Sequence, residues 1–184
     1  MFKIAVIVGS LRKESINKKL MHALDKLNHP KLKFNILDLT EVPLFNQDNE
    51  NNLTDAVAHL KKEIHSSDGV LFVTPEYNRS IPGVLKNVID WGTRPPGKNS
   101  WAKKPTAIIG TSEGAVATAV AQSHLRSILV AIDVILLGSP EVYLLYKKDL
   151  FDENYNITNE TTKKFLLEFL GKFSDWVEFH NQKS

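Results

Sequence analysis

Five short apolar runs alternate with five amphipathic segments along the chain, and this alternation limits the possible folds more than any other feature of the sequence. The apolar runs lie at residues 4–8, 34–39, 70–74, 106–110 and 134–137. The amphipathic segments repeat apolar residues every three or four positions, which is helical spacing, over residues 15–27, 54–66, 80–91, 117–131 and 160–179. A regular alternation of strand and helix predicts a parallel sheet with helices on both faces.

The character of the apolar runs indicates the order of the strands. Four runs are almost continuously apolar, as expected for strands that are covered on both faces, whereas the run at 34–39 alternates and is predicted at an edge. Five strands favour the flavodoxin-like order 2-1-3-4-5 over a six-stranded dinucleotide-binding sheet. We therefore expect residues 1–184 to form a single domain, a three-layer α/β sandwich around a five-stranded parallel sheet.

Composition excludes several classes of protein. A net charge of +2 is too weak to predict nucleic-acid binding. The absence of cysteine removes thiolate metal sites and cysteine nucleophiles, and the six histidines lack metal-ligand spacing, so no metal site is predicted. No apolar run reaches the length of a membrane span, and the chain enters a strand at once without a signal peptide. We expect a cytoplasmic protein.

The first loop, residues 9–17, joins the first predicted strand to the first predicted helix. It reads Gly-Ser-Leu-Arg-Lys-Glu-Ser-Ile-Asn. Ser10, Arg12, Ser15 and Asn17 therefore lie where a helix start offers unpaired N–H groups, a combination that suits a phosphate. A capped helix start alone would explain Ser15 but not Arg12 in the same turn.

The second loop, residues 74–83, follows the third predicted strand and reads Thr-Pro-Glu-Tyr-Asn-Arg-Ser-Ile-Pro-Gly. Its peptide N–H groups can meet the carbonyls of a planar heterocycle, while Tyr77 offers a ring edge and Asn78 a two-sided hydrogen-bonding group. The alternative interpretation is a rigid turn with a surface tyrosine. Glu76 here and Glu113 in the next loop are the acids expected near the site, and neither has an evident proton to move.

The third loop, residues 110–114, reads Gly-Thr-Ser-Glu-Gly and matches the nucleophile elbow of serine hydrolases. Asp133 and His180 follow Ser112 in the order of a catalytic triad, so a serine esterase is an open alternative. The chain is short for that fold, lacks an HGGG-type stretch, and carries His180 among its final residues. The other interpretation needs only small residues and exposed N–H groups, which let a ring system approach closely.

Taken together, these loops resemble those of the NADPH-dependent FMN reductase family, which includes quinone, azo-dye and chromate reductases. The resemblance covers nearly the whole chain and is weakest after about residue 145. Its most specific part is the continuous stretch at 74–91. The remaining matches are the first loop with Ser10, Arg12, Ser15 and Asn17, and residues 105–110 and 121–126.

The resemblance implies a flavodoxin-like fold that binds FMN non-covalently and forms homodimers or homotetramers. It implies that the phosphate and the nearby ribityl chain are held by residues of the first loop, namely Ser10, Arg12, Ser15, Ile16 and Asn17. The flavin ring and the ribityl chain are lined by residues of the second loop, namely Pro75, Glu76, Tyr77 and Asn78. The third loop closes on the ring with Ser112, Glu113 and Gly114. The family often has a pair of glycines where this chain has Ala117 and Thr118.

The expected activity has two steps. NADPH or NADH delivers hydride to the flavin, and a small-molecule acceptor such as a quinone, free flavin or azo compound then takes the electrons. No side chain is expected to act as a catalytic acid or base, because the cofactor performs the chemistry. A flavodoxin-like electron carrier without turnover is the second hypothesis, although such carriers are usually acidic and this chain has a pI near 8.7. The serine esterase is the third.

Overall fold

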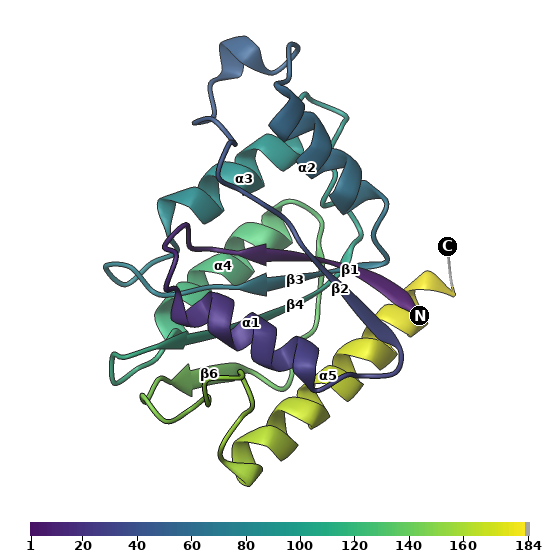
Figure 1. The fold of residues 1–184 in the computed structure, drawn as a ribbon. Coiled ribbons are helices and arrows are strands. Elements are labelled where there is room, and N and C mark those ends of the chain that lie inside the picture. The colour runs from purple at the N-terminus through teal and green to yellow at the C-terminus, as the bar shows by residue number, and fades with distance from the viewer. Residues whose placement is uncertain (183–184) are drawn as a thin grey trace.

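Strands and helices alternate along the chain, and the strands assemble into a parallel sheet (Figure 1). The computed structural model describes residues 1–182. Its strands are β1 (Phe2–Val8), β2 (Leu32–Ile36), β3 (Gly69–Val73), β4 (Pro105–Ser112), β5 (Ile135–Leu136) and β6 (Val142–Leu145). Its helices are α1 (Ile16–Lys26), α2 (Asp55–His65), α3 (Gly83–Thr93), α4 (Ala119–Ala131) and α5 (Glu160–Asn181), with a short 3₁₀ turn, η1 (Gln47–Asn49). The flavodoxin-like order β2-β1-β3-β4-β5 is confirmed.

The edge beside β4 corrects the prediction of five strands, because the described residues form six. β5 is only two residues long and pairs with the start of β4, whereas β6 pairs with its end, where Ile109 lies opposite Val142. Between them stand Gly138, Ser139 and Pro140. Proline has no N–H to donate to a ladder, so the edge is interrupted here and resumes over the β-prone residues 142–145. The sequence prediction missed this short second run.

Helices cover both faces of the sheet, and two apolar layers result. α1 and α5 pack on one face, against β1 residues such as Val6, and α2, α3 and α4 pack on the other, against β1 residues such as Ile7. Val6 and Ile7 point to opposite faces and are both fully buried, which explains why apolar and polar residues do not alternate along β1. Burial of each such side chain contributes about 1.5 to 3 kcal/mol.

The apolar stripe of α5 packs on the sheet. Leu166, Phe169, Phe173 and Val177 are buried against β1, β3 and β4, and Asn159 caps the helix by accepting a hydrogen bond from the Thr162 N–H at 2.9 Å. Among residues 1–182, no helix is long and apolar enough to cross a membrane.

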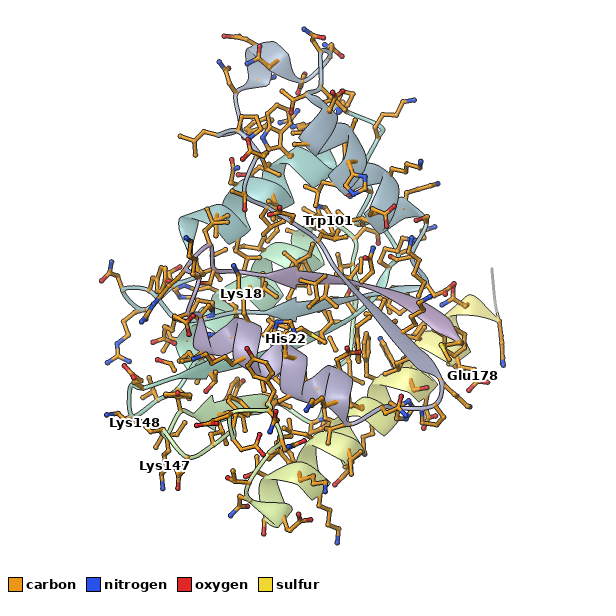
Figure 2. The ribbon with its side chains drawn as sticks, viewed as in Figure 1. Lys18, His22, Trp101, Lys147, Lys148 and Glu178 are labelled. Atoms are coloured by element: carbon orange, nitrogen blue, oxygen red, sulfur yellow. The ribbon has the colours of Figure 1, made fainter. Side chains whose placement is uncertain are left out.

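Trp101 anchors the segment that leads into β4. Its indole is fully buried between the sheet and α3 (Figure 2), with its ring centroid 5.5 Å from that of Phe72. Its Nε1 donates a hydrogen bond to the Ile89 carbonyl at 3.0 Å. A Cβ on Gly92 would lie only 2.0 Å from that Nε1, so α3 needs glycine at this position.

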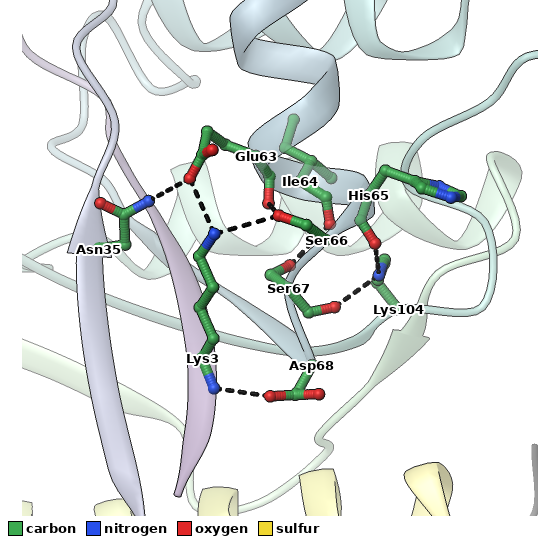
Figure 3. Close-up of polar contacts among 9 residues, drawn as sticks. All are labelled: Lys3, Asn35, Glu63, Ile64, His65, Ser66, Ser67, Asp68 and Lys104. Atoms are coloured by element: carbon green, nitrogen blue, oxygen red, sulfur yellow. Dashed lines mark hydrogen bonds and ion pairs between the residues drawn. The ribbon is translucent and has the colours of Figure 1, made fainter.

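The amino ends of the strands are joined by a network of polar side chains (Figure 3). The Lys3 N–H donates to Asp68 at 2.7 Å, and the Lys3 Nζ contacts Glu63 at 3.0 Å. Asn35 donates to the same Glu63 carboxylate at 2.7 Å. Lys104 donates to the carbonyls of His65 and Ser67. The side chains of this network therefore satisfy one another and the nearby backbone.

Candidate functional site

At the opposite edge, the segments after β1, β3 and β4 meet around a cavity of about 340 Å³, here called the central cleft. This is where ligands bind in doubly wound sheets. The cleft is lined by Ser10, Arg12, Ser15, Ile16, Asn17, Pro75, Glu76, Tyr77, Thr111, Ser112, Glu113 and Gly114. The structure thus brings together the predicted site residues from three distant segments. Asn78 lies outside this lining, and Thr111 is a member that the sequence did not reveal.

One end of the central cleft is rich in hydrogen-bond donors. Ser15 caps α1, but its Oγ lies 3.4 Å from the Lys18 N–H, so the cap is loose. Helix geometry leaves the N–H groups of Ile16 and Asn17 without an intrahelical acceptor. Ser10 is buried beside them, and Arg12 is exposed at the rim. The donors and the helix dipole make this end electrostatically favourable for an anion.

The acidic residue nearest to these donors in the sequence, Glu14, is paired with a lysine. Glu14 forms an ion pair with Lys19 at 2.9 Å. The hydrogen bond and charge of Lys19 hold the pKa of Glu14 below its ordinary value, so the carboxylate stays ionised and paired with Lys19. The Glu14 charge is therefore offset locally, which leaves the donor-rich end favourable for a bound anion.

Asn17 connects α1 to β4. Its Nδ2 donates to the Thr111 carbonyl at 2.9 Å, and the Thr111 N–H donates to its Oδ1 at 3.0 Å. Both residues are buried. This reciprocal pair fixes the amide, so Asn17 offers a ligand its backbone N–H and one remaining amide hydrogen. The contact joins two walls of the central cleft across 94 positions of sequence.

Glu76 has a role that the sequence did not indicate. Its side chain is only 7% exposed. Its Oε2 accepts hydrogen bonds from the N–H groups of Val120 and Ala121, at 3.1 and 3.0 Å. Thr118, at the helix start, makes no such cap. A carboxylate from the second loop therefore caps α4, and the helix start partly neutralises its charge.

After Glu76 the chain makes a tight two-residue turn. The N–H of Tyr77 donates to the Ser80 carbonyl and the N–H of Ser80 to the Tyr77 carbonyl, each at 3.0 Å. The central residues, Asn78 and Arg79, have φ values of 50° and 62°. Such a turn favours glycine or asparagine, so Arg79 adopts a backbone conformation that its side chain disfavours. The turn explains why α3 begins at Gly83 and not at residue 80, as expected from the sequence.

Beyond this turn a second cavity, of about 260 Å³, adjoins the central cleft. We call it the side pocket. It shares Glu76, Ser112 and Gly114 with the central cleft and adds Asn78, Arg79, Ala115, Val116 and Ala117. Ala117 has a φ of 49°, so the chain keeps a left-handed conformation at a position where alanine disfavours it. α4 accordingly begins at Ala119, two residues later than predicted.

The serine esterase alternative is wrong, because the structure does not bring its three residues together. Ser112 is the last residue of β4, at the carboxyl end of the sheet, and its Oγ accepts a hydrogen bond from the Gly114 N–H at 3.2 Å. Asp133 adjoins Lys103, before β4 begins, and His180 lies on α5 next to Asn181, which bonds Asp68 before β3. Both therefore lie at the amino end of the sheet.

Close packing explains why the Gly-Thr-Ser-Glu-Gly motif begins with a glycine, Gly110. A Cβ at this position would lie 2.2 Å from the Thr74 carbonyl oxygen and 2.7 Å from the Thr118 Oγ1. Only glycine lets β4 pass this close to the end of β3 and to the start of α4. The first glycine of the motif thus serves packing.

Comparison with known proteins gives consistent results. The profile of a family described as NADPH-dependent FMN reductase matches residues 2–149. A Burkholderia protein named 2-hydroxy-1,4-benzoquinone reductase is 47% identical over 175 residues, covering 95% of this chain and 96% of that protein. A quinone reductase of Pseudomonas putida is 42% identical over 180 residues, covering 97% and 96%.

Solved structures agree. The flavoenzyme NAD(P)H:(acceptor) oxidoreductase FerB from Paracoccus denitrificans superposes with a TM-score of 0.94 at 44% identity, covering 98% of this chain and 99% of that chain. A flavodoxin from Pseudomonas aeruginosa superposes with a TM-score of 0.58 at 19% identity, covering 93% and 98%, a likeness that concerns the fold alone.

Proposed function

Because the chain belongs to the NADPH-dependent FMN reductase family, we propose that the central cleft holds FMN, with the phosphate at the α1 end and the ring between the segments after β3 and β4. The chain is an FMN-dependent NAD(P)H oxidoreductase that reduces a quinone, flavin, azo compound or similar acceptor. The observation that carries the site assignment is the single lining that joins the donor-rich α1 loop to the two other loops.

The chemistry of the donors fits the phosphate of FMN. The hydroxyls of Ser10 and Ser15, the guanidinium of Arg12 and the N–H groups of Ile16 and Asn17 are all donors. Arg12 and the helix dipole each offset part of the phosphate charge, by about 1 kcal/mol or more where the contact is partly buried. Thr111, which lines the same cleft, is held in place by its two hydrogen bonds with Asn17.

The other end of the cleft suits a flat ring. Pro75 and Tyr77 line it on one side and Ser112, Glu113 and Gly114 on the other, and their backbone groups can meet the polar edge of the ring. Asn78 would reach the ring from the adjoining side pocket. Glu76 contributes through its backbone, because its carboxylate caps α4. Tyr77 lines the cleft and is 49% exposed, so its ring edge is accessible to a flat ligand at the mouth of the cleft.

The bound FMN supplies the redox chemistry: a hydride from NAD(P)H and a proton from solvent convert a quinone to its hydroquinone, with NAD(P)⁺ as the other product. The residues of the chain bind and orient the reactants. We assign no side chain as a catalytic acid or base.

The absorption spectrum of the purified protein tests the proposal. We expect yellow protein that NADPH bleaches under anaerobic conditions and that benzoquinone then recolours. Colourless protein that does not take up added FMN would contradict the site assignment.

An electron carrier would bind FMN in the same cleft but would not catalyse the oxidation of NAD(P)H. Relatives aligned over nearly the whole chain are named reductases, which favours an enzyme. The flavodoxin likeness adds nothing here, because it shows only a common fold. Steady oxidation of NADPH in the presence of benzoquinone separates the two, since a carrier would give no turnover.

We also propose that residues 1–184 form one FMN-binding domain that works as a homodimer or homotetramer in the cytoplasm. α5 lies beyond the family match yet packs on the same sheet, which supports one domain. Leu44 and Val130 are 85% and 65% exposed, so apolar surface is available for subunit contacts. NAD(P)H as electron donor supports the cytoplasm. Light scattering of the holoenzyme and cell fractionation test these points.

A further inference from the structure

The side pocket lies where a substrate that reaches the ring end of the central cleft would extend. It shares Glu76, Ser112 and Gly114 with that cleft and has no lining residue from the donor-rich α1 loop. Its other walls are mostly small or apolar residues, at positions 115–117. Arg79 supplies the positive charge of this lining.

Arg79 retains most of its capacity to bind an anion. Its side chain is 69% exposed, and its Nη1 lies 3.4 Å from the Glu76 Oε1, which is a long contact. The other oxygen of Glu76 already accepts two hydrogen bonds from the start of α4. The helix end carries roughly half a positive charge. Together with Arg79 it exceeds the single negative charge of Glu76, which leaves the side pocket positive.

The backbone holds Arg79 in place at an energetic disadvantage. The two hydrogen bonds of the Tyr77–Ser80 turn fix it in a left-handed conformation, and the Ser80 Oγ contacts the His124 Nδ1 on α4 at 3.1 Å. Glycine would fit this position without strain. A disfavoured conformation that is kept at the wall of a binding cavity points to a function for the side chain.

We propose that the side pocket is a substrate subsite in which Arg79 pairs with an oxyanion. This inference rests on the proposed function. The oxyanion has two possible sources in the reaction, namely the ionised hydroxyl of a hydroxyquinone and the 2′-phosphate of NADPH. A hydroxyl on a quinone ring is acidic and is ionised at neutral pH. Among the relatives, one is named for such a quinone.

The test uses the FMN-loaded enzyme and two variants, Arg79→Gln and Arg79→Gly. The first removes the charge, and the second also removes the backbone strain. Two ratios of kcat/KM are measured for each: 2-hydroxy-1,4-benzoquinone over 1,4-benzoquinone, and NADPH over NADH. Equilibrium dialysis gives the Kd of 2-hydroxy-1,4-benzoquinone for oxidised enzyme. Titration of flavin absorption gives the Kd values of NADP⁺ and NAD⁺. Lys86→Gln is the matched control, because it removes an exposed, ion-paired cation outside both cavities.

We expect one of the two ratios to fall about tenfold in both variants, with the matching Kd raised by a similar factor, and neither to change in the control. A fall in the quinone ratio identifies the hydroxyquinone as the source, and a fall in the nucleotide ratio identifies the phosphate. Arg79→Gly should keep or raise the melting temperature, which a structural role of Arg79 would not allow.

The proposal is overturned if both ratios and the dissociation constants stay within twofold of wild type in both variants. Failure of the proposed function looks different, because the wild-type enzyme would then not be bleached by NADPH. The dialysis measurement reports on the subsite in that case as well.

Discussion

The polar groups at the two ends of the parallel sheet differ in whether they are paired with other protein groups. At the amino end, Lys3, Glu63 and Asp68 satisfy one another, and Lys104 binds carbonyl oxygens (Figure 3). At the carboxyl end, the donors around Arg12 and Ser15 face a cavity. A closed network contributes to stability and has little left to offer a ligand, whereas unpaired donors at a cavity wall are available for binding.

The largest effect is expected from Arg12→Ala and Ser15→Ala. In the proposed site each removes a hydrogen bond to the dianionic phosphate, so the Kd for FMN should rise about tenfold to a hundredfold. Titration of the apoprotein against FMN fluorescence measures it. Lys13→Ala, which removes an adjacent exposed charge outside the cleft lining, is the control and should bind FMN almost as wild type does. Unchanged affinity in both variants would show that the phosphate lies elsewhere.

Asn17→Ala should affect stability as well as binding. It leaves the buried N–H and carbonyl of Thr111 without partners, which costs about 2 to 4 kcal/mol. Urea denaturation of the apoprotein measures the loss. FMN affinity should fall too, because Thr111 lines the central cleft. The matched control at the other end is Asn35→Ala, which removes one hydrogen bond to Glu63. Equal losses in the two variants would contradict a special role for the Asn17–Thr111 pair.

Lys3→Met should have a smaller effect, confined to stability. The Lys3 side chain is 39% exposed, so its ion pair with Glu63 contributes about 1 kcal/mol or less. Its backbone hydrogen bond to Asp68 is kept. The Kd for FMN should equal that of wild type, and a change in it would show that the two ends of the sheet are coupled.

The same division explains what the sequence could predict. Apolar periodicity depends on neighbouring residues, so it predicted the strand order, and loop composition predicted the segments that meet at the cleft. The Asn17–Thr111 pair and the cap of α4 by Glu76 join residues 94 and 44 positions apart, and no local pattern reports on them. The short strand β6 was missed for a related reason, since its four residues become a strand only because the end of β4 offers them a partner.

The triad-like order of Ser112, Asp133 and His180 is the opposite case, because here a sequence pattern suggested a contact that the structure does not contain. The three residue types and their order suited a hydrolase, but a parallel sheet places residues after strands and residues before strands at opposite ends. Ser112 ends β4, whereas Asp133 precedes β5. Their separation follows from the predicted topology, so the alternative could have been excluded from the strand order alone.

The smallest expected effect concerns pH and a partly buried lysine, Lys61, at the amino end of the sheet. The Lys61 Nζ donates to the carbonyls of Gly92 and Lys98, and burial lowers the pKa of Lys61 from 10.5 to about 8. As pH rises between these values, the folded protein loses this proton while the unfolded chain keeps it. The unfolded state then binds more protons, so the free energy of unfolding rises with pH.

Lys61→Met removes that contribution. From pH 8 to pH 10.5 the stability of wild type should therefore increase relative to the variant, whereas below pH 8 the difference should be constant. The side chain is only partly buried, so solvent screening keeps the change small. Burial also lowers the pKa of Lys104, but this residue is present in both proteins, so its contribution cancels in the stability difference between them. Urea denaturation at several pH values measures it. A wild-type stability that instead falls relative to the variant as pH rises would mean that the two carbonyls stabilise Lys61 in its charged form.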